Sequence, residues 1–97
     1  HALARRQMKG FGGVLSIELA GGYDAAKSLV GRLQLVANAV SLGGVETLAV
    51  HAASVWEGSL SIAQIEAAGV STALVRIAVG LEHPEDLVRD FEQALVV

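Results

Sequence analysis

Arg76 is the residue of this sequence whose type and position point most directly to chemistry. It lies in the middle of residues 73–79, which are otherwise apolar. A guanidinium in such a strand has to reach either solvent or a fixed anion, and its planar fork binds a carboxylate through two parallel hydrogen bonds. The residues alone leave two interpretations open, an arginine on an exposed sheet face and an anion-binding arginine.

A second candidate is the small-residue turn at residues 41–44, which reads Ser-Leu-Gly-Gly. The glycines of this turn permit a close approach of the backbone to a ligand or to another segment of the chain. Nothing in the spacing connects the turn with Arg76.

The other polar residues fit structural roles better than a metal site or a nucleophile. His1, His51 and His83 are scattered, and none has a metal-binding partner at the helical i, i+4 spacing. We expect His51 at the end of a strand and His83 as the capping residue of a helix that begins at Pro84. The sequence contains no cysteine, which excludes a disulfide framework, a thiolate nucleophile and Cys-ligated metals. We therefore expect no metal site in this chain.

The composition indicates one small, ordered domain of 97 residues, 53% of them hydrophobic and 18% charged. A net charge of −3 predicts no nucleic-acid partner, and no uncharged run is long enough to span a membrane. The start at His1, without a signal peptide, leads us to expect a cytoplasmic piece of a longer protein. The apolar content also predicts a surface covered in a dimer or by another domain, and an ordinary monomer is the alternative.

Alternating apolar and polar residues predict three strands, over residues 14–19, 45–50 and 74–79. In the first, Leu15, Ile17 and Leu19 share one face and alternate with polar residues. Together with the helices described next, these strands predict an α/β protein, an α+β two-layer sandwich. The expected sheet is small and mixed or antiparallel, with helices on one face.

Capping signals and helical spacing predict the helices. Asp24 is the expected N-cap of an amphipathic helix of about 14 residues that reaches Val36. Ser61 and Gln64 form a capping-box pair for a short helix that Gly69 ends.

Three strings in the chain, in order and at close to the expected spacing, match the motifs of one known family. Residues 1–16 resemble the segment that opens the second half of its small domain. Residues 41–48, S-L-G-G-V-E-T-L with His51 following, resemble its S-L-G-G-x-E-[ST]-L…H-P-A block. Residues 74–87 include L-V-R-I-A-V-G-L-E and then E-D-L, which resemble L-V-R-L-S-V-G-[IL]-E-x-x-x-D-L. The family is that of the Cys/Met-metabolism enzymes, which depend on pyridoxal 5′-phosphate (PLP).

The resemblance implies that residues 1–97 are the C-terminal part of the small domain of a fold type I PLP enzyme, without the PLP-binding large domain. It implies that Arg76 holds the α-carboxylate of a sulfur-containing amino-acid substrate and that Ser41 assists it. Lys9 and Lys27 are the two lysines, and neither lies in the family's Schiff-base motif. No catalytic or cofactor-binding residue is therefore expected in this chain, and the isolated chain should be inactive. Family members are commonly homotetramers, so the implied partners are the enzyme's own large domain and further copies.

Val40, directly before the S-L-G-G serine, is the residue that we expect to influence substrate choice. Many cystathionine-processing relatives have glutamate there, whereas methionine γ-lyases resemble the Ala-Val-Ser found here. An apolar side chain suits a methionine-like substrate better than one with a distal amino group. Residues 51–57 depart from the family's H-P-A-S-M-T-H, so cystathionine γ-synthase, cystathionine γ-lyase and homoserine sulfhydrylase stay open. A stand-alone small-ligand or dimerisation module is the alternative of another class.

Overall fold

The computed structural model describes residues 1–95. Its centre is a four-stranded mixed sheet in the order β1-β4-β3-β2, made of β1 (Val14–Glu18), β2 (Ala37–Asn38), β3 (Leu48–His51) and β4 (Leu74–Ala78). β4 pairs antiparallel with β1 on one side and with β3 on the other, and β2 runs parallel to β3. The predicted fold class is confirmed, and the sheet is of the mixed kind.

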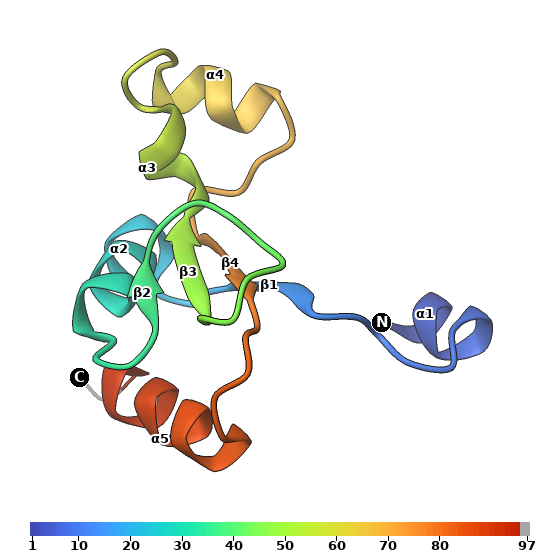
Figure 1. Cartoon of the computed structure of the whole chain (residues 1–97). Coiled ribbons are helices and arrows are strands. Elements are labelled where there is room, and N and C mark those ends of the chain that lie inside the picture. The colour runs from blue at the N-terminus through green and yellow to red at the C-terminus, as the bar shows by residue number, and fades with distance from the viewer. Residues whose placement is uncertain (96–97) are drawn as a thin grey trace.

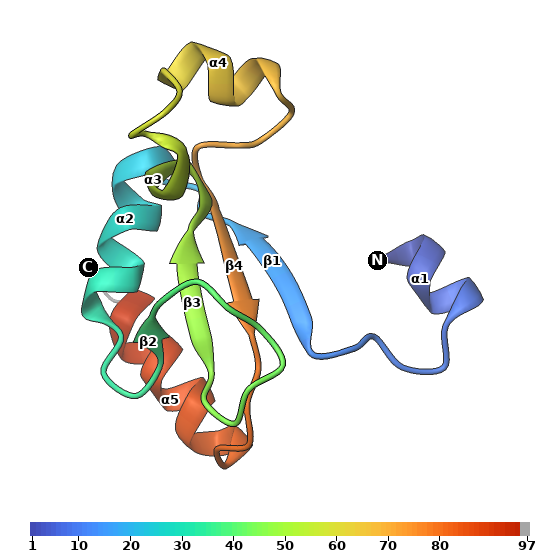
Figure 2. The same cartoon turned by 45° about the horizontal axis from the view of Figure 1, so that its top comes forward.

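Two helices, α2 (Gly22–Arg32) and α5 (Pro84–Leu95), cover one face of this sheet (Figure 1). Within β4, Val75 and Ile77 face these helices and belong to the buried core. The core residues are Ala26, Leu29, Val30, Val36, Ala49, Val75, Ile77 and Ala94. The expectation of helices on one face is confirmed, and within residues 1–95 no helix covers the opposite face of the sheet (Figure 2).

The remaining helices lie outside this two-layer unit. Figure 1 shows α3 (Ala52–Trp56) and α4 (Ile62–Ala67) beyond one end of the sheet. The capping box of α4 is confirmed, because the Ser61 hydroxyl accepts from the Gln64 N–H and the Gln64 side chain accepts from the Ser61 N–H. Gly69 follows the C-cap with a φ of +87°, a left-handed conformation that favours glycine. α1 (Ala2–Gln7) projects away from the sheet on an extended segment (Figure 2).

Two predictions about the first large helix are wrong. Its N-cap is Gly21 rather than Asp24, which lies in the first turn. The helix ends at Arg32 rather than near Val36, and the residues that follow form β2, a strand that the periodicity did not predict. The physical reason is the carboxylate of Asp90 on α5, which accepts the N–H groups of residues 34–36 at 2.8 Å each. Those N–H groups are then unable to continue the helix.

The start of α5 agrees with its sequence signals. His83 Nδ1 accepts a hydrogen bond from the N–H of Glu85 at 3.2 Å, which confirms the capping role expected before Pro84. In the described part of the chain, no helix has the length and apolar character needed to cross a membrane.

Candidate functional site

Arg76 lies at the centre of β4, on the sheet face that α2 and α5 leave open. It pairs in register with Ser16 of β1 and Val50 of β3, whereas its neighbours Val75 and Ile77 point into the core. The side chain is partly buried, although it is on the face without helices. Arg76 therefore lies on the open face of the sheet, but its side chain is not fully exposed to solvent.

The guanidinium of Arg76 uses only part of its hydrogen-bonding capacity within the described residues. One terminal nitrogen, Nη2, donates to the carbonyl oxygen of Ser41 at 2.9 Å. The Nε atom is buried and has no hydrogen-bond partner within residues 1–95. A buried N–H without an acceptor is costly, and an ionised carboxylate supplies the acceptor geometry that a guanidinium fits best. The structure thus brings together Arg76 and Ser41, which are 35 positions apart, and leaves the buried Nε of Arg76 without an acceptor among the described residues.

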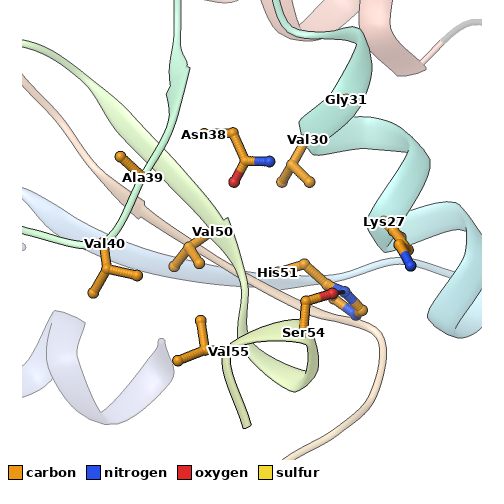
Figure 3. A pocket seen from close by; sticks show the side chains of 10 residues that line it. All are labelled: Lys27, Val30, Gly31, Asn38, Ala39, Val40, Val50, His51, Ser54 and Val55. Atoms are coloured by element: carbon orange, nitrogen blue, oxygen red, sulfur yellow. Dashed lines mark hydrogen bonds between the residues drawn. The ribbon is translucent and has the colours of Figure 1, made fainter. Parts of the chain in front are cut away.

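Val40 lies at the rim of a groove of about 490 Å³ (Figure 3). The groove begins where the parallel strands β2 and β3 end, and α2 and α3 complete its walls. Figure 3 shows Val40, Val50 and Val55 together on one side, and polar side chains including Asn38 and Ser54 on the other. Val40 is 62% exposed, so its side chain is available for contact with another molecule or domain.

His51 ends β3, as expected, and is held by two hydrogen bonds that the sequence did not reveal. Its ring is 2% exposed, with Nε2 at 2.7 Å from the carbonyl oxygen of Thr72 and Nδ1 at 2.6 Å from the Ser54 hydroxyl. Because a carbonyl oxygen can only accept, Nε2 carries the proton and donates. The Tyr23 ring contacts His51 edge-on at 4.8 Å. These contacts make His51 a structural residue that joins β3 to α3 and to the turn before β4.

Residues 1–95 do not fit a PLP site. Lys9 and Lys27 are both exposed, and Lys27 lies on α2, the helix that covers the sheet face opposite Arg76. Lys27 is near the Tyr23 ring, with its Nζ 5.7 Å from the ring centroid. Within the same residues no cluster of three His, Asp or Glu side chains is placed to hold a metal ion. Among the described residues, the two lysines and the acidic and histidine side chains thus form neither a PLP-binding nor a metal-binding group.

Comparison with known proteins finds a family match along nearly the whole chain. Residues 1–96 match the model of the Cys/Met metabolism PLP-dependent enzymes. Among curated relatives, the L-methionine gamma-lyase of Fusobacterium nucleatum subsp. polymorphum is 47% identical over 95 residues, covering 98% of this chain and 24% of the relative. The cystathionine gamma-synthase of Escherichia coli K12 is 45% identical over 92 residues, covering 95% of this chain and 24% of the relative.

Solved structures give the same result. The crystal structure of metB from Corynebacterium glutamicum superposes with a TM-score of 0.80 at 46% identity, covering 98% of this chain and 24% of that one. The cystathione gamma lyase CalE6 from Micromonospora echinospora also gives 0.80, at 36% identity, with 98% and 25% of the two chains covered. The present chain thus spans about a quarter of the length of its relatives. The motif resemblance is confirmed, and the chain belongs to the Cys/Met metabolism PLP-dependent enzyme family.

Proposed function

We propose that this chain is the C-terminal part of the small domain of a PLP-dependent enzyme of sulfur amino-acid metabolism, a methionine γ-lyase-like carbon–sulfur lyase. Its role in that enzyme is to hold the α-carboxylate of the substrate. The observation that carries this proposal is the buried, unpartnered Nε of Arg76 beside an Nη2 already fixed by the Ser41 carbonyl. A carboxylate that accepts from this side chain gives it the acceptor that it lacks.

In this proposal, Arg76 orients the substrate. Arg76 rises from the middle of a strand that is paired on both sides, so its Cα position is well fixed. Two hydrogen bonds from a planar fork fix both the position and the rotation of a carboxylate, and with it the bonds at the adjacent α-carbon. From the family resemblance we also propose that the Ser41 hydroxyl assists as a neutral donor, beside the contact of the Ser41 carbonyl with Arg76. The lysine that binds PLP and the cofactor's phosphate site belong, in this proposal, to the remainder of the enzyme.

Val40 supports a methionine-like substrate in preference to cystathionine. Together with Val50 and Val55 it forms the apolar side of the groove (Figure 3), and Ser41 is the next residue in the sequence. A methylthio group is compatible with such a wall, whereas the distal ammonium of cystathionine would lack a counter-charge there. The chain is about equally identical to a methionine gamma-lyase and to a cystathionine gamma-synthase. Cystathionine γ-synthase is therefore the competing candidate, together with cystathionine γ-lyase and homoserine sulfhydrylase.

From the resemblance we also propose a cytoplasmic homotetramer as the working assembly, with the large domain and other copies of the chain as partners. The apolar side chains exposed on this chain support a covered surface. Leu42, Val45 and Leu81 are 59%, 67% and 80% exposed, which is unusual for three side chains on neighbouring segments. Sedimentation of the full-length enzyme would test the assembly, since a monomer at micromolar concentration would contradict it.

The test of the proposed site is Arg76→Lys in the full-length enzyme, with kcat/KM for L-methionine and the thermal midpoint measured together. Lysine keeps the charge but loses the fork, so we expect kcat/KM to fall about ten- to a hundred-fold, the value of one charge-assisted hydrogen bond. Ser41→Ala should cost less, about 1 kcal/mol. Arg89→Lys is the matched control, because Arg89 is exposed on α5 and pairs only with Glu85 and Asp86 of its own helix among the described residues.

The thermal midpoint should stay unchanged in all three variants. Normal efficiency in Arg76→Lys would mean that Arg76 is a surface arginine. Unfolding in place of lost activity would mean that its role is structural. Either result would remove the basis of the proposal.

A further inference from the structure

The loop that carries Ser41, residues 39–47, has little apolar packing to hold it. Its three large apolar side chains, Val40, Leu42 and Val45, are 59–67% exposed. A loop whose large apolar side chains are exposed is positioned mainly by its polar contacts. At its first end these are the hydrogen bond from Ala39 N–H to the Ala49 carbonyl at 3.2 Å and the contact of Arg76 with Ser41.

The second end of the loop is held by Glu82, in the turn after β4. One carboxylate oxygen of Glu82 accepts from the Thr47 N–H at 2.8 Å, and the other accepts from the Thr47 hydroxyl at 2.6 Å. The same hydroxyl oxygen accepts from the Gly80 N–H at 2.8 Å. Thr47 is 1% exposed, and its hydrogen bonds to Glu82 lower the pKa of the Glu82 carboxyl, which is therefore an ionised acceptor at neutral pH.

The turn and the loop are also in direct backbone contact at this point. The N–H of Leu81 donates to the Val45 carbonyl at 2.9 Å. A Cβ atom on Gly80 would overlap that carbonyl and would lie 2.7 Å from the Thr47 nitrogen, so only glycine fits here. Since residue 80 is two positions after the end of β4, the loop is attached to the same strand that carries Arg76.

We propose that Thr47 and Glu82 are positioning residues for the carboxylate site. They fix the far end of loop 39–47, so that the Ser41 carbonyl stays on Nη2 of Arg76 and the guanidinium keeps one orientation at the carboxylate site. Neither residue touches the substrate. This inference rests on the proposed function of Arg76, and it adds to the same site one further residue from each of the two motifs that contain Ser41 and Arg76.

The test compares Thr47→Val with Thr47→Ser in the full-length enzyme. Valine keeps the shape and loses the hydroxyl, whereas serine keeps the hydroxyl. The readout is the inhibition constant of L-norleucine, an amino acid without sulfur, against that of L-norleucinamide, which lacks the carboxylate. We expect Thr47→Val to weaken norleucine about tenfold and norleucinamide less than about twofold, and Thr47→Ser to stay within about twofold for both.

Glu82→Gln is the second variant, used if Thr47→Val does not fold. It retains one acceptor oxygen, so we expect a loss of about three- to five-fold that is again confined to norleucine. Equal weakening of both inhibitors, or no weakening, would show that the Thr47–Glu82 contact is only structural and would overturn the inference. Arg76→Lys separates this outcome from failure of the proposed function. If Arg76 binds the carboxylate, this variant must reduce the preference for norleucine over norleucinamide. If Arg76→Lys leaves that preference unchanged, the proposed site itself is wrong.

Discussion

Replacing Asp90 with asparagine should loosen the connection between α2 and β2 in the full-length enzyme. Asp90 is 7% exposed, and its two carboxylate oxygens accept the three N–H groups of residues 34–36 at 2.8 Å and the Gln93 side chain at 3.0 Å. Asparagine has the same shape but has one acceptor oxygen and one NH₂ donor. If the oxygen keeps the N–H groups of Leu35 and Val36, the N–H of Gln34 faces a donor. The opposite orientation leaves Leu35 and Val36 without their acceptor.

The expected cost follows from this geometry. Each oxygen of Asp90 accepts two hydrogen bonds, so two of the four are lost in either orientation and the remaining two become neutral, which together amount to at least about 2–3 kcal/mol. The local free energy of opening should fall by that amount, so the amides of residues 34–36 should exchange with deuterium on the order of a hundredfold faster. Asp86→Asn is the matched control on the same helix, because Asp86 is exposed and its 3.3 Å pair with Arg89 is worth little.

Hydrogen–deuterium exchange by mass spectrometry on peptides that cover residues 33–38 measures this directly. Unchanged exchange in Asp90→Asn would refute the reasoning, because it would mean that the carboxylate does not hold these amides in solution. An equal acceleration in Asp86→Asn would also refute it, since the cause would then be a general effect on α5.

The contribution of Asp90 to stability should depend on pH. Burial by itself would raise the pKa of Asp90, but hydrogen bonds from Gln34, Val36, Gln93 and Leu35 outweigh it, so the pKa is lowered from its ordinary value of 3.8. A lowered folded-state pKa gives stability that is fully present above the ordinary value and is lost as the pH falls through the lowered one. The difference in denaturant midpoint between the native enzyme and Asp90→Asn should therefore be constant at neutral pH and close only in acid. A difference that changes between pH 6 and 8 would contradict this assignment.

Two further predictions concern the site. Gly80→Ala should lower the activity and should lower the stability by about 1–3 kcal/mol, because the new Cβ would meet the backbone of residues 45–47. The control Gly44→Ala should be close to neutral, because nothing lies within 4 Å of its Cβ. Equal effects of the two substitutions in kinetic and thermal assays would contradict this prediction. Val40→Glu should raise kcat/KM for cystathionine relative to that for methionine by about two- to five-fold, the value of an exposed ion pair. The neutral control Val40→Gln should leave this ratio unchanged. A shift of the same size in the control would exclude a charge effect.

Much of the fold could be predicted from local patterns. The alternation in residues 14–19 and 74–79 predicted β1 and β4; β4 buries Val75 and Ile77, whereas in β1 only Ile17 is partly buried. The capping box at Ser61 and the glycine at position 69 were correct, because capping geometry depends on a few neighbouring residues. The end of α2 and the existence of β2 could not be predicted, because both depend on a carboxylate more than fifty positions away in the sequence.

The candidate site shows the same limit. Arg76 was identifiable as a charged residue in an apolar strand, but its contact with the Ser41 carbonyl depends on how loop 39–47 returns over the sheet. Thr47 and Glu82 each belong to one of the quoted motifs, but their hydrogen bonds were not predicted, because neither motif shows that the two residues meet. Contacts of this kind are set by tertiary structure, and the sequence had no local signal for them.

The central claim is that Arg76 binds the substrate's α-carboxylate, and a crystal structure of the full-length enzyme with L-norleucine bound tests it most directly. We expect two hydrogen bonds of about 2.7–2.9 Å from the Arg76 guanidinium to the carboxylate oxygens, with Nε as one of the donors. We also expect that Nη2 keeps its contact with the Ser41 carbonyl. A carboxylate held by other residues, with Arg76 Nε still lacking an acceptor, would contradict the claim.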